Sequence, residues 1–209
     1  MKRLILWRGI DEWRAEASSV EVASNGVRAT GTQLGTDPLP YRADYKLDAT
    51  DGFVTRRFEV TTGGTGWSRR VVLTHDGVGG WECAAETDGR VDLPAPGVDA
   101  QMLAGALDCD LGFSPLTNLM PVRRHRLHEG PGAEDFVMAW VSVPSLEVFA
   151  SAQRYEFVRR DDDIRIVRFI DRGRFAGFTA ELELDADGLV VLYPELAQRS
   201  GEPPLRGCP

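Results

Sequence analysis

Apolar and polar residues alternate along most of the chain, so that every second side chain faces the same way. In residues 41–49, tyrosine, alanine and leucine occupy the odd positions and charged residues the even ones. A period of two is typical of a β-strand with one buried and one solvated face. Asn25-Gly26, Asp51-Gly52 and similar pairs stand at the edges of such runs, and these pairs favour β-hairpin turns. The pattern therefore predicts antiparallel strands joined by short turns.

The alternation predicts about eleven strands at the spacing of a sandwich or a barrel. They are 18–24, 26–35, 40–49, 53–62, 68–75, 79–86, 121–128, 134–143, 147–159, 163–171 and 174–194, the last divisible at Asp187-Gly188. Short helical segments are expected at 11–17 and at 100–107, where Asp99 would be the N-cap. No rhythm of alternating strands and long helices occurs, so a parallel sheet is not expected.

A polar segment, residues 108–124, interrupts the strand pattern near the middle of the chain. Ser114 followed by Pro115 is typical of a helix N-cap with proline at the first helical position. Pro121 is expected to end that helix after a turn or two. Arg123 and Arg124 then fall on the predicted strand 121–128 and face opposite sides. Two interpretations stay open: the segment closes one end of the β structure through its own hydrogen bonds, or it binds a ligand.

The same segment resembles the core motif of the putative glycolipid-binding family. The resemblance rests on Asp108-x-Asp110, Ser114-Pro115-x-Thr117-Asn118 and residues 121–124, with further matches at Asp76-Gly77-x-Gly79-x-Trp81, 153–155 and 187–194. It covers nearly the whole chain. It implies an incomplete barrel, in the manner of bacterial lipid and lipoprotein carriers, and glycolipid binding as the expected function.

Pattern and resemblance together predict an all-β protein with minor α content. We expect a curved antiparallel sheet forming an open or nearly closed β-barrel, with one or two short helices at the mouth. Residues 1–209 fit one domain, within which residues 94–97 form a loop between two groups of strands.

The strand around Trp140 is apolar on both faces. Phe136, Met138 and Trp140 share one side, whereas Val137 and Ala139 share the other with later valines. Such a strand either lies in a filled core or lines an apolar cavity, and large curved sheets tend to enclose cavities.

The expected function is non-catalytic binding of an amphiphile, a lipid or glycolipid, in an apolar cavity of the sheet. The candidate ligand-binding residues are Asp110, Ser114, Thr117, Asn118, Arg123, Arg124, Trp140, Gln153, Arg154, Tyr155 and Tyr193. An inward arginine needs an anion, either a carboxylate such as Asp108 or Asp110 or a bound head group. Asp110 itself is expected to accept hydrogen bonds from Asn118, from Arg123 or from the backbone.

Two alternatives stay open. Asp110, Arg123 and Tyr155 could act as an acid–base and anion-binding set in a small cavity enzyme. An exposed sheet edge could instead make the protein an interaction module. No nucleophile elbow occurs, and His125 and His128 on one strand would point to opposite faces, so neither a metal nor a cofactor is expected.

Composition narrows the partners and the compartment. The formal net charge is −8 and the pI is about 5.0, which disfavours nucleic acids and anionic bilayers. Cys83, Cys109 and Cys208 form no zinc or disulfide pattern, which fits a reducing compartment. The apolar run at residues 4–7 is too short for a signal peptide, and no apolar run is long enough to span a membrane. We therefore expect a cytoplasmic protein. The sequence specifies no oligomeric state.

Overall fold

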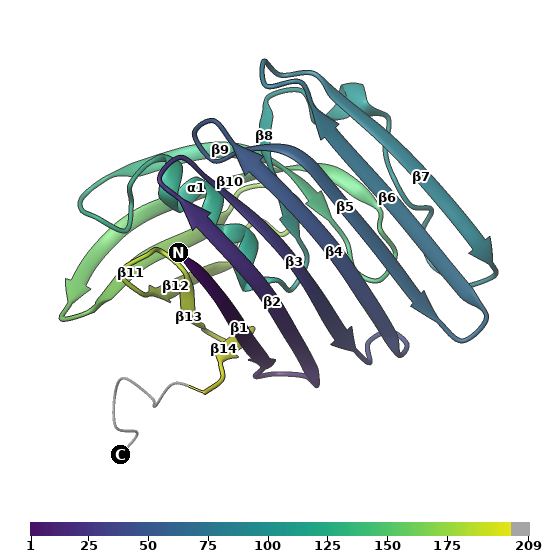
Figure 1. Ribbon diagram of the computed structural model, residues 1–209, viewed down its shortest axis with the longest axis horizontal. Coiled ribbons are helices and arrows are strands. Elements are labelled where there is room, and N and C mark those ends of the chain that lie inside the picture. Colours follow the sequence, from purple (N-terminus) through teal and green to yellow (C-terminus); the bar gives the residue numbers. More distant parts are fainter. Residues whose placement is uncertain (202–209) are drawn as a thin grey trace.

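The computed structural model describes residues 1–201, and these form one 14-stranded sheet. Its order is β7-β6-β5-β4-β3-β2-β1-β14-β13-β12-β11-β10-β9-β8 (Figure 1). The strands are β1 (Lys2–Gly9), β2 (Arg14–Ala23), β3 (Gly26–Gly35), β4 (Tyr41–Thr50), β5 (Val54–Gly64), β6 (Trp67–His75), β7 (Trp81–Gly89), β8 (Ala106–Leu111), β9 (Ala133–Val141), β10 (Val148–Asp161), β11 (Ile164–Asp171), β12 (Thr179–Leu184), β13 (Val190–Tyr193) and β14 (Ala197–Arg199). Within the described residues, neighbouring strands are antiparallel except β8 and β9, and the sheet is not closed by hydrogen bonds. The predicted fold class, a curved and open antiparallel β structure, is confirmed.

Most predicted strands are present within a few residues of their expected ends. The predicted strand 174–194 is divided into β12 and β13, with Asp187-Gly188 in the turn between them. Three strands were not predicted: β1, β8 and β14. The helical turn expected at 11–17 is wrong, because β2 already begins at Arg14. Asp99 does cap a helical segment, but it is a 3-10 helix, η1 (Ala100–Leu103), that ends before β8.

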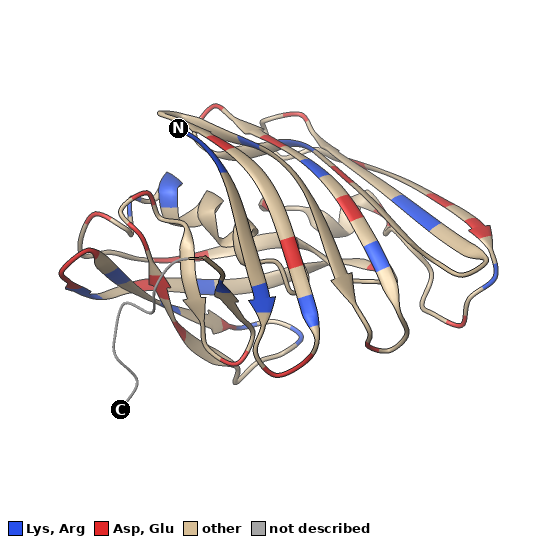
Figure 2. Cartoon of the chain, turned by 60° about the horizontal axis from the view of Figure 1, so that its bottom comes forward, with Lys and Arg blue, Asp and Glu red and all other residues tan. Residues whose placement is uncertain are grey.

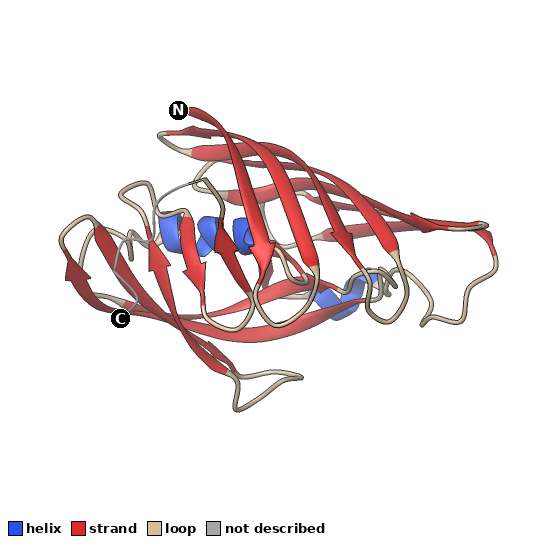
Figure 3. Cartoon of the chain, turned by 90° about the horizontal axis from the view of Figure 1, so that it is seen from below, coloured by secondary structure: helices blue, strands red, loops and turns tan. Residues whose placement is uncertain are grey.

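The predicted strand 121–128 is wrong, because this segment is helical. Ser114 caps the 3-10 helix η2 (Pro115–Asn118), as predicted, and the chain continues directly into α1 (Leu119–Arg124). Pro121 does not end the helix. It lies in the first turn of α1, where the missing N–H would have no intrahelical acceptor. The two helical segments lie between the two halves of the curved sheet (Figure 3), rather than at its rim.

This helical segment separates two apolar cores. Leu116, Leu119 and Met120 pack in the larger core with residues of β2–β6. Val122 and the following Leu127 pack in a second core with residues of β10–β13. The helical segment therefore fills the space between the sheet halves, and most of the interior is packed with side chains.

The β8 edge of the sheet lies against the inner side of β5. The Cys109 backbone N–H donates a hydrogen bond to Thr55 Oγ1 of β5 at 3.1 Å, and Cys109 and Leu111 belong to the larger core. Successive side chains of β8 face opposite sides, so Asp108 and Asp110 face away from that core. Burial of one β8 face thus fixes the direction of both aspartates.

Charged residues of both signs cross the strands as bands rather than gathering in one basic region (Figure 2). Several pair across neighbouring strands. Arg70 contacts Glu59 at 2.9 Å and Glu86 at 3.3 Å, and Arg168 contacts Glu156 and Glu181. Such exposed pairs add little stability, but they keep the outer face solvated.

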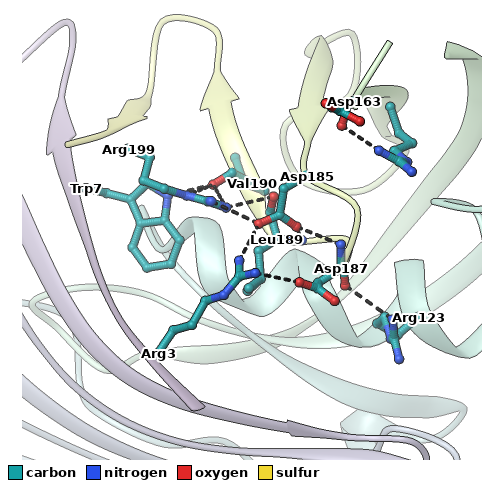
Figure 4. Close-up of polar contacts among 10 residues, drawn as sticks. Arg3, Trp7, Arg123, Asp163, Asp185, Asp187, Leu189, Val190 and Arg199 are labelled. Carbon is teal, nitrogen blue, oxygen red and sulfur yellow. Dashed lines mark hydrogen bonds and ion pairs between the residues drawn. The ribbon is translucent and has the colours of Figure 1, made fainter. Parts of the chain in front are cut away.

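A partly buried polar cluster joins β1 and β14 to the turn before β13 (Figure 4). Arg199 of β14 contacts Asp185 at 2.9 Å, and Arg3 of β1 contacts both Asp185 and Asp187. The indole N–H of Trp7 donates to the Val190 carbonyl at 2.9 Å. These contacts fix the turn before β13 against β1. Among residues 1–201, no helix has the length and apolar character needed to cross a membrane.

Candidate functional site

The candidate site is a cavity of about 320 Å³ between β8–β11, η2 and β13. Its lining combines six aromatic rings with a few polar side chains: Asp110, Leu111, Phe113, Ser114, Asn118, Trp140, Gln153, Phe169, Asp171, Phe175, Phe178, Tyr193 and Leu196. A mainly apolar cavity with a small number of polar groups is the usual form of a small-molecule site. Of the predicted ligand-binding residues, Asp110, Ser114, Asn118, Trp140, Gln153 and Tyr193 line it.

Strand register brings the central polar residues together. Asp110 of β8 pairs with Trp140 of β9, and Gln153 of β10 pairs with Asp171 of β11. Paired residues on neighbouring strands point to the same face of a sheet. Four residues far apart in sequence therefore share one wall of the cavity.

Three phenylalanines of the lining are exposed, whereas Phe169, Tyr193 and most of the polar side chains are buried and Asp110 is partly buried. Phe175 is 49% exposed and Phe178 37%, whereas Asp171 is 5% and Gln153 1% exposed. Phe175 and Phe178 belong to the connection between β11 and β12. Phe113 lies in the turn before η2 and is also exposed. The side of the cavity toward solvent is therefore mainly aromatic.

Asp110 is held by two neutral donors. Thr117 Oγ1 donates to its Oδ1 and Gln153 Nε2 to its Oδ2, both at 2.7 Å. Burial raises the pKa of Asp110 to about 6, the two hydrogen bonds oppose this rise, and the negative charges of Asp171 and Asp108 add to it. The predicted partners Asn118 and Arg123 are wrong. The expectation that the carboxylate is held internally is correct.

The pH dependence of the free energy of unfolding should reveal the raised pKa of Asp110. Its pKa is higher in the folded than in the unfolded chain, so its contribution is present below about pH 4 and is lost as pH rises through about 6. An Asp110→Asn variant lacks this loss. The difference in free energy of unfolding, variant minus wild type, should therefore rise by about 2 kcal/mol from pH 4 to pH 7. Urea unfolding of both proteins over that range measures the difference, and a constant difference would contradict the raised pKa.

Asp171 is the second carboxylate of the cavity. Its Oδ1 accepts the backbone N–H groups of Gly173 at 2.8 Å and Phe175 at 3.1 Å. These bonds shape the turn that carries Phe175. Asp171 thus both faces the cavity and positions part of its mouth.

Tyr155 and Ser114, both predicted ligand-binding residues, form buried hydrogen bonds next to the cavity. Tyr155 is fully buried and donates to Asn118 Oδ1 at 2.7 Å. Ser114 donates to Glu16 of β2 at 2.8 Å. Burial raises the pKa of Tyr155, and the charge of Asp110 adds to this rise. Tyr155 and Thr117 are therefore one hydrogen bond away from cavity-lining groups without lining the cavity themselves.

The three predicted arginines lie outside the cavity. Arg124 forms two hydrogen bonds to Asp108 at 2.7 and 2.6 Å, which confirms the predicted internal Asp–Arg pair. Arg123 contacts His128 at 3.1 Å and the Asp187 carbonyl at 3.5 Å. Arg154 contacts Asp135 at 2.6 Å on the outer face. Because Arg123 and Arg124 are helical, the expected alternation of their side chains does not apply.

Sequence reasoning missed five of the lining residues used below: Phe113, Phe169, Asp171, Phe175 and Phe178. Three of them lie in connections, where no period exists. Phe169 and Asp171 share a face of the predicted strand 163–171, but their position beside Gln153 depends on the pairing of β10 with β11. The sequence signal that could have indicated them is local: residues 169–178 contain three phenylalanines close to an aspartate.

The part of the chain that the structure describes offers no ligand set for a metal ion. Residues 1–201 contain no group of three or more His, Cys, Asp or Glu side chains arranged to hold an ion. Cys83 and Cys109 are free thiols, and Cys208 lies outside the described residues. His125 and His128 lie in the turns after α1 rather than on a strand.

Residues 4–199 match the model of the family described as "Putative glycolipid-binding". The chain belongs to this family. Its fold is also similar to the crystal structure of a DUF1089 family protein from Pseudomonas aeruginosa, with a TM-score of 0.68 and 26% sequence identity over 92% of this chain and 95% of that one. No curated protein matches the chain. The resemblance seen in the central motif is thus confirmed, and the cavity lies beside that motif.

Proposed function

We propose that the protein binds an amphiphilic ligand in this cavity without transforming it. The observation that carries the proposal is the lining of the cavity, which combines buried polar side chains with aromatic rings, three of them exposed to solvent. The polar end of an amphiphile would contact Asp110, Asp171 and Gln153, and its chain would lie along Trp140 and the phenylalanines. The family description supports a lipid or glycolipid as the class of ligand.

The size of the cavity limits the bound part of the ligand. A volume of about 320 Å³ is at the lower end of the range for small-molecule sites. It suits one short chain with its head group rather than a complete two-chain lipid. Each buried methylene contributes about 0.8 kcal/mol, so affinity should rise with chain length and stop rising when the chain leaves the cavity.

Trp140→Ala should weaken binding of an octyl-chain ligand roughly 10- to 100-fold, because a large aromatic contact surface is removed. Calorimetry measures this without relying on the fluorescence of the lost indole. Trp13→Ala is the matched control, since Trp13 is exposed and lies outside the cavity lining; its affinity should equal that of wild type. Equal loss in both variants, or none in Trp140→Ala, would count against the cavity as the binding site.

Two features favour binding over catalysis. The enzymatic alternative requires Arg123 beside Asp110 and Tyr155, but Arg123 contacts His128 and Asp187 instead. Tyr155 donates its hydroxyl proton to Asn118, and burial raises its pKa, so it is poorly suited to proton transfer. We extend the proposal to a single domain over residues 1–209 and a cytoplasmic location, both of which rest on the sequence.

A further inference from the structure

The cavity carries negative charge and no positive charge. Asp110 and Asp171 both line it, and neither forms an ion pair within residues 1–201. No lysine, arginine or histidine is among the lining residues. Two carboxylates in a largely buried site favour a cationic partner, because a buried charge is costly unless it is paired.

Within residues 1–201, one carboxylate oxygen of the cavity lining has no hydrogen-bond donor. Both hydrogen bonds that Asp171 accepts go to Oδ1, so Oδ2 of this 5%-exposed side chain has none within the described residues. Gln153 Nε2 already donates to Asp110, Asn118 Nδ2 to the Pro115 carbonyl, and Ser114 to Glu16. A primary ammonium group can therefore donate to Asp171 Oδ2, whereas a quaternary ammonium group would meet the carboxylates through charge alone.

Aromatic rings line the same cavity as the two carboxylates. Trp140 and Phe175 have ring centroids 5.5 Å apart, Phe169 and Phe178 6.0 Å, and Phe178 and Tyr193 6.4 Å. The faces of such rings attract ammonium groups, and several rings around one site are a known means of binding quaternary ammonium ions. The rings can therefore contact both parts of a cationic amphiphile. They attract its head group by cation–π interaction and pack against its chain by apolar contact.

We propose that the polar group recognised in this cavity is an organic ammonium ion, so that the ligand is an alkylamine or a quaternary alkylammonium compound. This inference rests on the proposed binding function and names its ligand class. An anionic head group would add a third negative charge beside Asp110 and Asp171. A neutral sugar would leave both carboxylates without a counter-charge.

A set of ligands with the same chain and different heads tests the inference. Octylamine, octyltrimethylammonium, octanol, octanoate and octyl glucoside are titrated into the whole protein by calorimetry at about pH 7.5, above the pKa of about 6 of Asp110. The two cations should bind at least about tenfold more tightly than the other three, since hydrogen bonds and contacts to charged groups are stronger than neutral ones. If no member binds, the binding function itself fails. If octanol, octanoate or octyl glucoside binds as tightly as the cations, the cation inference is overturned and the binding function stands.

Charge-removing variants locate the contact. Asp110→Asn and Asp171→Asn keep the size of each side chain, and the amide oxygen that Asp171→Asn introduces can still accept the two backbone N–H groups. Each variant should lower the affinity for octyltrimethylammonium about tenfold and that for octanol by a clearly smaller factor. Asp135→Asn, on the outer face beside Arg154, is the matched control and should change neither. Cation affinity that is the same in all three variants and wild type would overturn the inference.

Discussion

Asp108→Ala is expected to lower the free energy of unfolding by about 3–5 kcal/mol, because it leaves a buried guanidinium without its counter-charge. Asp108 is fully buried, and Arg124 reaches both of its carboxylate oxygens. Burial raises the pKa of Asp108, while the two hydrogen bonds from Arg124 oppose that rise. The ion pair connects β8 to α1, so its loss should also loosen the helical segment between the two sheet halves.

A double-mutant cycle on Asp108 and Arg124 separates the interaction energy of the pair from the effect of losing each side chain. Arg124→Ala should cost as much as Asp108→Ala, and the double variant clearly less than the sum of both, because no unpaired charge remains. Urea denaturation followed by far-UV circular dichroism measures all three. Glu129→Ala, which removes an exposed ion pair with Arg126, should leave the unfolding midpoint unchanged. Additive losses in the cycle would show that the two side chains do not act as a pair.

Asp110→Ala should lower the free energy of unfolding by less than Asp108→Ala does. The sequence alone suggests that either aspartate pairs with an arginine, and it does not distinguish them. Asp110 is instead held by Thr117 and Gln153, so its removal leaves no charge unpaired. Asp108 thus contacts α1, whereas Asp110, only two residues later, contacts η2 and β10.

The strands were predictable because their signal is local. Alternation at 41–49 and the Asn-Gly and Asp-Gly turns specify β-hairpins without knowledge of the rest of the chain. β8 was not predicted, because residues 106–107 fall in the expected helical segment and 108–111 in the polar segment. It also pairs in parallel with β9, so no hairpin turn marks it. β14 is only three residues long, too short for alternation to stand out.

The cavity was predictable only in part, because it depends on strand register. Asp110, Trp140, Gln153 and Tyr193 were candidates from motif and composition, but nothing in the sequence places Asp171 beside Gln153. The helical segment was misjudged for a related reason. Pro121 is unfavourable inside a helix but acceptable in its first turn, and where that turn begins depends on how η2 packs between the sheet halves.

Glu16 connects the N-terminal half of the sheet to the cavity. It is buried on β2 and accepts hydrogen bonds from Ser18 at 2.9 Å, Tyr45 at 2.6 Å, Gln33 at 3.1 Å and Ser114 at 2.8 Å. Burial raises the pKa of Glu16, and these four donors oppose the rise. One carboxylate thus joins β2, β3 and β4 to the N-cap of η2, whose Ser114 lines the cavity.

Glu16→Ala is expected to cost about 3 kcal/mol or more of unfolding free energy, because each buried donor left without an acceptor costs about 1–3 kcal/mol. Glu16→Gln keeps the size and one acceptor, so its loss should be clearly smaller. Ser114→Ala removes a single donor and should cost least, about 1 kcal/mol. Chemical denaturation orders the three variants, and calorimetry with an octyl-chain ligand shows whether loosening the η2 cap also weakens binding. An unfolding midpoint for Glu16→Ala equal to that of wild type would mean that the buried network contributes nothing to stability. The position of Ser114 in the cavity would then have to be maintained by Pro115 and the packing of η2 alone.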